Sequence, residues 1–167
     1  MHTPAELLDP TIVTFGKLLL AMLLGGLIGT ERAVVAKQPA GTRTFGLVAL
    51  GACLFVVTGL YVDGIYLGIL SFDPMHIAAS VVTGIGFIGA GLIIFRGESV
   101  HGITTAAGLW IAAAVGVATG FGMYAVSFFA TVLTLIMFTG MWYIERKFKQ
   151  WFDVHSPDGR NSSGIAQ

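Results

Sequence analysis

Uncharged apolar segments alternate with short polar ones along this chain, and the apolar segments have the length of membrane spans. A helix needs roughly 20 apolar residues to cross a bilayer. Three segments meet this requirement: residues 12–29, 44–62 and 76–95. The first contains Lys17 near its outer end, where a lysine side chain can reach the membrane interface.

A fourth apolar segment, residues 103–144, carries no charge and is about twice as long as one span. Glycine pairs mark turns, so Gly120 and Gly122 divide it into spans 103–119 and 122–144. The pattern therefore predicts an all-α integral membrane protein, a bundle of about five transmembrane helices within residues 12–144. Residues 1–11 form a leader and residues 145–167 a basic tail that we expect to be partly disordered.

Composition agrees with a membrane protein. Hydrophobic residues make up 55% of the chain and charged residues 11%, whereas soluble domains are about a quarter charged. The formal net charge is zero, which gives no reason to expect nucleic-acid binding. Cys53 is the single cysteine, so an intrachain disulfide or a cysteine metal cluster is excluded. The lipid bilayer is therefore the expected surroundings of the bundle.

The first apolar segment is expected to be a retained helix. A secretory signal peptide has a basic leader and a small-residue cleavage site. Here the leader carries Glu6 and Asp9, and no such site follows before Glu31 and Arg32.

The loop cations predict the orientation of the bundle. Eight lysines and arginines lie outside the spans: Arg32, Lys37, Arg43, Arg96, Arg146, Lys147, Lys149 and Arg160. With five spans, all of them fall on one side, which the positive-inside rule assigns to the cytosol. Four or six spans would divide them between the two sides. We therefore expect the N-terminus outside the cytosol and the C-terminus inside it.

Small residues indicate how the helices pack, because they let membrane helices approach closely. Such residues recur every four positions in two spans: Gly25 and Gly29 in the first, and Gly108, Ala112 and Gly116 in the fourth. The third span carries glycines on two faces: Gly84, Gly86, Gly89 and Gly91. Two such faces suggest close neighbours on both sides, so we expect the third helix at the centre of the bundle.

Catalytic and cofactor motifs are missing from the chain. There is no HExxH, GxSxG, P-loop or CxxC motif, and the four histidines are scattered. The GxGxxG match at residues 84–89 lies inside an apolar span, which is the wrong place for a dinucleotide-binding loop. We therefore expect no enzyme activity, cofactor or metal site.

The remaining candidates for chemistry are polar residues at the cytosolic ends of the helices. They are Glu31, Arg32, Arg43, Thr44, Arg96, Glu98, Thr104 and Thr105. Arg32 continues the face of Gly25 and Gly29 and should point into the bundle. The two threonines at 104 and 105 could cap the fourth helix. A glutamate should pair with an arginine across helices, because unpaired charges near hydrocarbon are costly. Interfacial anchoring is the alternative role for each of them.

Four ordered segments of this chain resemble the MgtC/SapB family of bacterial inner-membrane proteins. They are LLGGLIGTER at 23–32, AGTRT at 40–44, GIGFIGAG at 84–91 and VHGITTAA at 100–107. The resemblance implies an inner-membrane protein linked to magnesium limitation and, in some pathogens, to virulence. It also implies contact with other membrane proteins or small membrane peptides. Longer members carry a soluble cytosolic domain that would follow the last helix.

Two functions remain open from the sequence. The first is a non-enzymatic regulatory membrane protein that acts by helix–helix contact with other proteins or with itself, as a homo-oligomer. The alternative is a small transporter or channel with the polar residues at its cytosolic mouth. Transporters usually place polar residues at mid-membrane, whereas mid-span positions here are mostly Gly, Ala, Leu, Ile and Val. That pattern favours the regulatory function.

Overall fold

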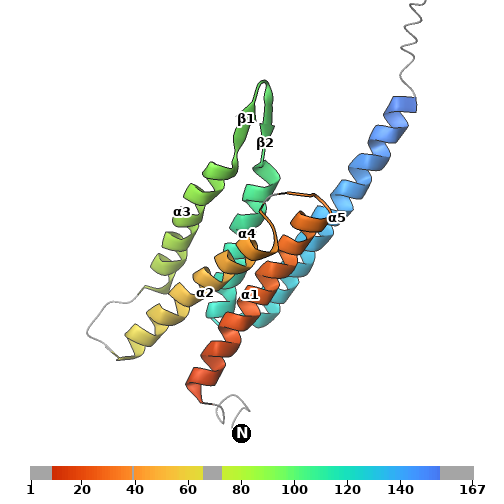
Figure 1. The fold of residues 1–167 in the computed structure, drawn as a ribbon. Coiled ribbons are helices and arrows are strands. Elements are labelled where there is room, and N and C mark those ends of the chain that lie inside the picture. Colours follow the sequence, from red (N-terminus) through yellow and green to blue (C-terminus); the bar gives the residue numbers. More distant parts are fainter. Residues whose placement is uncertain (1–8, 39, 66–72, 155–167) are drawn as a thin grey trace, which may run out of the picture.

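The computed structural model describes residues 9–38, 40–65 and 73–154. It contains five helices and a short hairpin: α1 (Pro10–Val34), α2 (Thr42–Ile65), α3 (Pro74–Leu92), β1 (Ile94–Arg96), β2 (Ser99–His101), α4 (Ile103–Gly120) and α5 (Tyr124–Val154) (Figure 1). All five helices are long and apolar enough to cross a membrane. Most of the predicted leader and the end of the predicted tail lie outside the described residues.

Asp-Pro pairs begin two of the helices. Asp9 precedes α1 and accepts the backbone N–H of Thr11 at 2.8 Å, while Asp73 precedes α3 and accepts that of Met75 at 2.9 Å. Each aspartate accepts from a backbone N–H that has no partner within the first turn. The first helical position tolerates proline, because an N–H there would have no partner in the helix either. The bonds to Thr11 also hold the pKa of the Asp9 carboxyl below its usual value.

The third helix ends earlier than predicted, because a β-hairpin follows it. We expected a span over residues 76–95 and a polar loop to Gly102. Instead, Ile94 to Arg96 pairs antiparallel with Ser99 to His101. Gly97 (φ 61°) supplies the positive φ that this two-residue turn uses. β-Branched and aromatic residues such as Ile94 and Phe95 favour strands. They therefore form a strand here, because Gly97 allows the chain to turn back and pair with itself.

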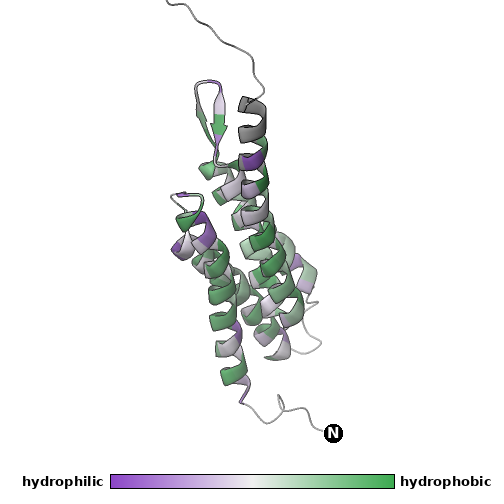
Figure 2. Ribbon diagram, turned by 90° about the vertical axis from the view of Figure 1, so that its right-hand side faces the viewer, coloured by the Kyte–Doolittle hydropathy of each residue, from purple (hydrophilic) through white to green (hydrophobic). Residues whose placement is uncertain are grey.

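The last two helices meet at the predicted break. Gly122, with φ 80°, lies in the turn between α4 and α5. The final helix then continues to Val154, so residues 145–154 of the predicted tail are helical. Its apolar part is Tyr124–Met141. Figure 2 shows hydrophobic residues along the length of the helices and hydrophilic residues mainly near their ends.

Helix α4 lies at the centre of the bundle, in contact with α1, α2, α3 and α5. Its small residues make this possible. A methyl group on Gly116 would collide with the Ala49 carbonyl of α2, and one on Gly108 would lie 2.9 Å from the Phe138 ring of α5. Helix α1 approaches α2 in the same way, since a methyl group on Gly29 would lie 2.7 Å from the Phe45 Cβ.

Helix α3 lies at the edge of the bundle, so the expectation that it is central is wrong. Only Ile85 and Gly89 are buried among its residues. Methyl groups on Gly84, Gly86 or Gly91 would meet nothing within 4 Å. The reason is that α4 presents small residues over most of its circumference and takes the central place, which leaves the glycine faces of α3 largely uncovered.

Candidate functional site

A buried ion pair lies in the last turn of α1. The Arg32 Nε donates to the Glu31 Oε2 at 2.6 Å, and the two residues are 6% and 7% exposed. Arg32 lies on the face that carries Gly25 and Gly29, and that face is buried against the neighbouring helices. The guanidinium carbon also lies 3.9 Å from the centre of the Phe138 ring on α5. The pair therefore connects α1 with α5 through a cation–π contact.

The predicted pairing across helices is wrong, because this ion pair joins two neighbours on one helix. Helix α1 packs against α2, α4 and α5. Both side chains are enclosed there, and each is the other's ion-pair partner. Arg43 lies in the first turn of α2 and is exposed. The second oxygen of Glu31, Oε1, is buried and has no hydrogen-bond partner among the described residues.

The other polar candidates divide between different places. Thr104 lies with Arg32 around one pocket, whereas Arg43 and Thr44 line a groove between α2 and α3. Glu98 is exposed in the hairpin turn. Arg96 ends β1, and its side chain lies outside what the structure describes.

The expected threonine caps of α4 are also wrong. Gly102, with φ 91°, occupies the N-cap position and makes no side-chain capping bond. Thr104 and Thr105 lie inside the first turn, one and two residues after Ile103, where a side chain cannot serve as the N-cap. Thr105 is buried and Thr104 is exposed.

The pocket beside Arg32 lies between α4 and α5 and has a volume of about 680 Å³. We call it the α4–α5 pocket. Its lining residues are Arg32, Ala36, Ile103, Thr104, Ala107, Gly108, Ile111, Leu133, Thr134, Met137, Phe138 and Met141. Arg32 is the charged residue among them, and most of the others are apolar.

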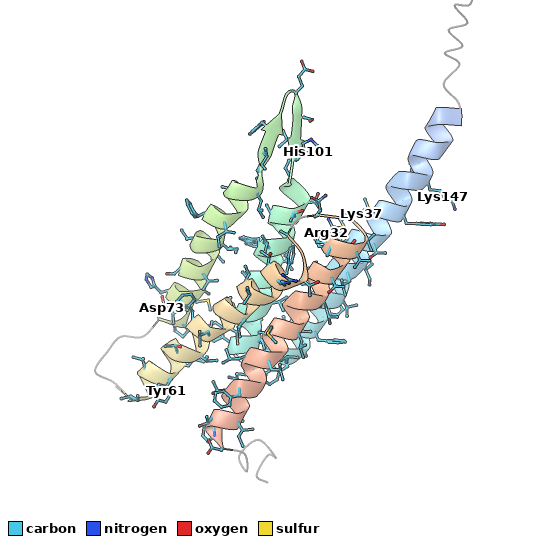
Figure 3. The ribbon with its side chains drawn as sticks, in the orientation of Figure 1. Arg32, Lys37, Tyr61, Asp73, His101 and Lys147 are labelled. Atoms are coloured by element: carbon cyan, nitrogen blue, oxygen red, sulfur yellow. The ribbon has the colours of Figure 1, made fainter. Side chains whose placement is uncertain are left out.

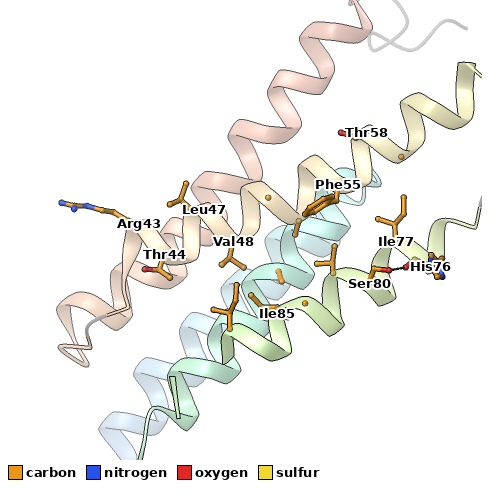
Figure 4. Close-up of a pocket in the computed structure, with 17 residues that line it drawn as sticks. Arg43, Thr44, Leu47, Val48, Phe55, Thr58, His76, Ile77, Ser80 and Ile85 are labelled. Atoms are coloured by element: carbon orange, nitrogen blue, oxygen red, sulfur yellow. Dashed lines mark hydrogen bonds between the residues drawn. The ribbon is translucent and has the colours of Figure 1, made fainter. Parts of the chain in front are cut away.

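A larger apolar groove lies between α2 and α3, with a volume of about 920 Å³. We call it the α2–α3 groove. Figure 4 shows Arg43 toward one end and His76 toward the other, with Val48, Phe55 and Ile85 between them. Its walls carry few polar groups, and the groove is open because α3 contacts the bundle only along a narrow strip.

A hydroxyl cluster that the sequence did not reveal joins α4 and α5 nearer the opposite end of the bundle. Thr119 Oγ1 donates to the Val115 carbonyl at 2.7 Å and lies 3.0 Å from the Ser127 Oγ. Thr131 donates to the Ser127 carbonyl at 2.9 Å, and Thr119, Ser127 and Thr131 are all buried. The four-residue spacing of Ser127 and Thr131 places both on one face of α5, which is the signal that could have found them.

Lys17 reaches this same end of the molecule. Its Nζ donates to the Gly120 carbonyl at the end of α4, at 3.0 Å. Other charged residues lie toward the ends of the bundle. Figure 3 shows Arg32, Lys37 and Lys147 toward the end with the hairpin and Asp73 toward the other end. Within the described residues, no three His, Cys, Asp or Glu side chains come together as metal ligands.

Five long apolar helices packed through small residues define a multi-pass helical membrane protein. The sequence pattern of the MgtC family matches residues 18–147, which include the buried ion pair, most of α1 and the apolar segments of the other four helices. This chain belongs to the MgtC family.

Curated relatives support the membership. The chain is 43% identical over 123 residues to YhiD of Escherichia coli (strain K12), whose name describes it as a candidate magnesium transporter; the match covers 72% of this chain and 57% of YhiD. It is 47% identical over 115 residues to protein MgtC of Brucella abortus (strain 2308), covering 69% of this chain and 45% of that protein. It is 43% identical over 118 residues to protein MgtC of Salmonella typhimurium (strain 14028s / SGSC 2262), covering 71% and 48%.

The chain thus spans about half the length of these curated relatives. No solved structure matches it.

Proposed function

We propose that this chain is a non-enzymatic regulatory protein of the bacterial inner membrane, which acts by helix–helix contact with other membrane proteins or small membrane peptides. Its N-terminus would lie outside the cytosol and its C-terminus inside. The observation that carries the proposal is the uncovered glycine surface of α3 beside the α2–α3 groove. Gly84 lines this groove, and neither Gly84 nor Gly91 has a neighbour within 4 Å of its Cβ position.

Packing in lipid explains why this surface suits another helix. Membrane helices associate through close van der Waals contact at small residues rather than through the hydrophobic effect. Gly84 and Gly91 are seven residues apart and share one face of α3. The opposite wall of the groove includes Gly51, Ala52 and Gly59 of α2, whose small side chains leave the backbone accessible to a neighbouring helix. A single apolar helix could therefore contact both walls closely.

The biological setting comes from the family. A link to magnesium limitation, and to virulence or stress adaptation, is part of this proposal and rests on the MgtC-family relatives. Helix–helix contact needs no catalytic group, which agrees with the apolar character of the α2–α3 groove. Self-association through α3 would be a further use of the same surface.

Leucines placed on the glycine face would test the proposal. A Gly84→Leu/Gly91→Leu variant should keep its folded yield in detergent, because the added side chains meet open space. It should fail to restore growth under magnesium limitation to a strain that lacks the protein. Ala79→Leu is the matched control, since Ala79 is exposed on the far side of α3. Equal growth with both variants would contradict docking at this face.

Transport is the second candidate, and the name of YhiD favours it. Buried polar groups near both ends of the bundle, Glu31 with Arg32 and Thr119 with Ser127, could belong to a pathway. Purified protein in liposomes should then carry Mg²⁺ inward, and Glu31→Gln should slow the flux. Absence of flux together with lost growth in the Gly84→Leu/Gly91→Leu variant would leave the regulatory function.

A further inference from the structure

The α4–α5 pocket combines a buried cation with apolar walls. Arg32 is 6% exposed, yet it lines this pocket of about 680 Å³. The rest of the lining consists of apolar residues, glycine and two threonines, Thr104 and Thr134. A guanidinium at such a place is costly unless acceptors satisfy its N–H groups.

The contacts of Arg32 leave most of its donors available. A guanidinium carries five N–H donors. The structure describes one hydrogen bond from this side chain, from Nε to Glu31, and places the guanidinium carbon 3.9 Å from the centre of the Phe138 ring. The ring attracts the charge of the guanidinium but has no lone-pair oxygen that could accept from the terminal N–H groups. The terminal amino groups can therefore bind an acceptor that enters from the pocket.

The pocket walls indicate what kind of molecule brings the acceptor group. On α4 the lining runs from Ile103 to Ile111, a depth of about 12 Å at 1.5 Å per residue. That is close to the roughly 15 Å of one leaflet. Leu133 and Met137 line the pocket on α5. Arg32 thus lies beside an apolar pocket that extends about 12 Å along α4, which matches a lipid with an anionic oxygen group at its head and part of an acyl chain against the pocket walls.

We propose that the α4–α5 pocket binds a glycerophospholipid, with its phosphodiester oxygens on the Arg32 guanidinium and one acyl chain along Ile111, Leu133 and Met137. Phosphate oxygens are strong acceptors for arginine, and the pair is stronger where water is excluded. Glu31 contributes by accepting from Nε, which leaves the terminal amino groups for the phosphate. This site is separate from the α2–α3 groove and does not rest on the proposed function.

Lipid titration of delipidated, detergent-solubilised protein tests the site, with the thermal unfolding midpoint as the readout. Phosphatidylglycerol should raise the midpoint. Diacylglycerol has the chains without the phosphate, and glycerol 3-phosphate has the phosphate without the chains; neither should match it. Equal stabilisation by diacylglycerol would overturn the role of Arg32. Equal stabilisation by glycerol 3-phosphate would overturn the lipid in favour of a soluble phosphate.

A pocket-filling variant separates this site from general lipid contact. Ala107→Trp fills the pocket but leaves Arg32 and Glu31 in place. The concentration of phosphatidylglycerol that gives half the shift should rise roughly tenfold or more, as expected when a charge-assisted hydrogen bond is lost. Ala90→Trp is the control, since Ala90 is exposed on α3 near the same end of the bundle and lines none of these pockets. Ala107→Trp with the same titration curve as Ala90→Trp would refute the proposal.

A second variant covers the case in which Ala107→Trp does not fold. In Glu31→Gln/Arg32→Gln both charges are removed together, so neither is left buried alone, and the two amides can hydrogen bond to each other. This variant should fold and lose the preference for phosphatidylglycerol over diacylglycerol. A retained preference would contradict the assignment.

Discussion

The crossing of α2 and α4 predicts that a single methyl group at Gly116 destabilises the whole bundle. An ideal Cβ on Gly116 would collide with the carbonyl oxygen of Ala49 and lie 2.9 Å from its Cα. Both obstacles are backbone atoms of α2, so no side-chain rotation can relieve them. In Gly116→Ala the two helices must therefore move apart.

The required movement sets the size of the effect. Carbon atoms pack at about 3.5–4.0 Å, so the helices must separate by roughly 1 Å. A gap of this size forfeits a quarter to a half of each pairwise attraction along the interface. Ala52, Ala112 and Ala113 are buried close to this crossing, and they would lose part of their contacts with the facing helix. We expect a loss of about 1–3 kcal/mol, the cost typical of overpacked cores, and a larger loss for Gly116→Leu.

Unfolding in mixed micelles with increasing denaturing detergent, followed by circular dichroism, measures this loss. Gly86→Ala is the matched control: it adds the same methyl group to a glycine of α3 that has nothing within 4 Å. Alanine is the better helix former by up to about 1 kcal/mol, so the control should be neutral or stabilising. The reasoning is refuted if the two variants unfold at the same detergent fraction.

Three further predictions follow from other parts of the molecule. Arg32→Gln leaves the Glu31 carboxylate buried without its partner and should cost about 3–5 kcal/mol in the same unfolding assay; a loss below 1 kcal/mol would contradict this. A reporter fused at Tyr66 should give an external signal and one at Ser156 a cytosolic signal, and the reverse result would refute the orientation. Thr119→Val removes a buried interhelical hydroxyl contact and should lower the free energy of unfolding by about 0.6 kcal/mol. An unchanged free energy of unfolding would contradict a stabilising role for that contact.

Sequence reasoning found the five helices because each is a long apolar segment, and a membrane leaves the backbone few alternatives. The break before α5 was also visible, because glycines at 120 and 122 interrupt an otherwise continuous segment. The hairpin was missed for the opposite reason. Ile94 and Phe95 are apolar and follow an apolar span directly, so hydropathy alone cannot separate the last helical turn from a short strand.

The packing of the helices was less predictable. Gly116 and Gly84 look alike in the sequence, yet one meets the backbone of α2 and the other meets nothing. A glycine face shows where a helix can come close, but it does not show whether the neighbour belongs to the same chain. The polar candidates failed similarly: Arg32 was correctly placed inside, but its partner depends on how α5 and α2 enclose α1.

The bond from Lys17 to Gly120 has a consequence for how the chain enters the membrane. The ammonium and its acceptor are 103 residues apart. At 5–20 residues synthesised per second, the carbonyl exists only about 5–20 s after the lysine. During that interval α1 carries a cation that must stay near the lipid headgroups, so the helix is held at a shallow position. The arrival of α4 supplies the acceptor, so the first helix reaches its final depth only after the fourth has entered the membrane.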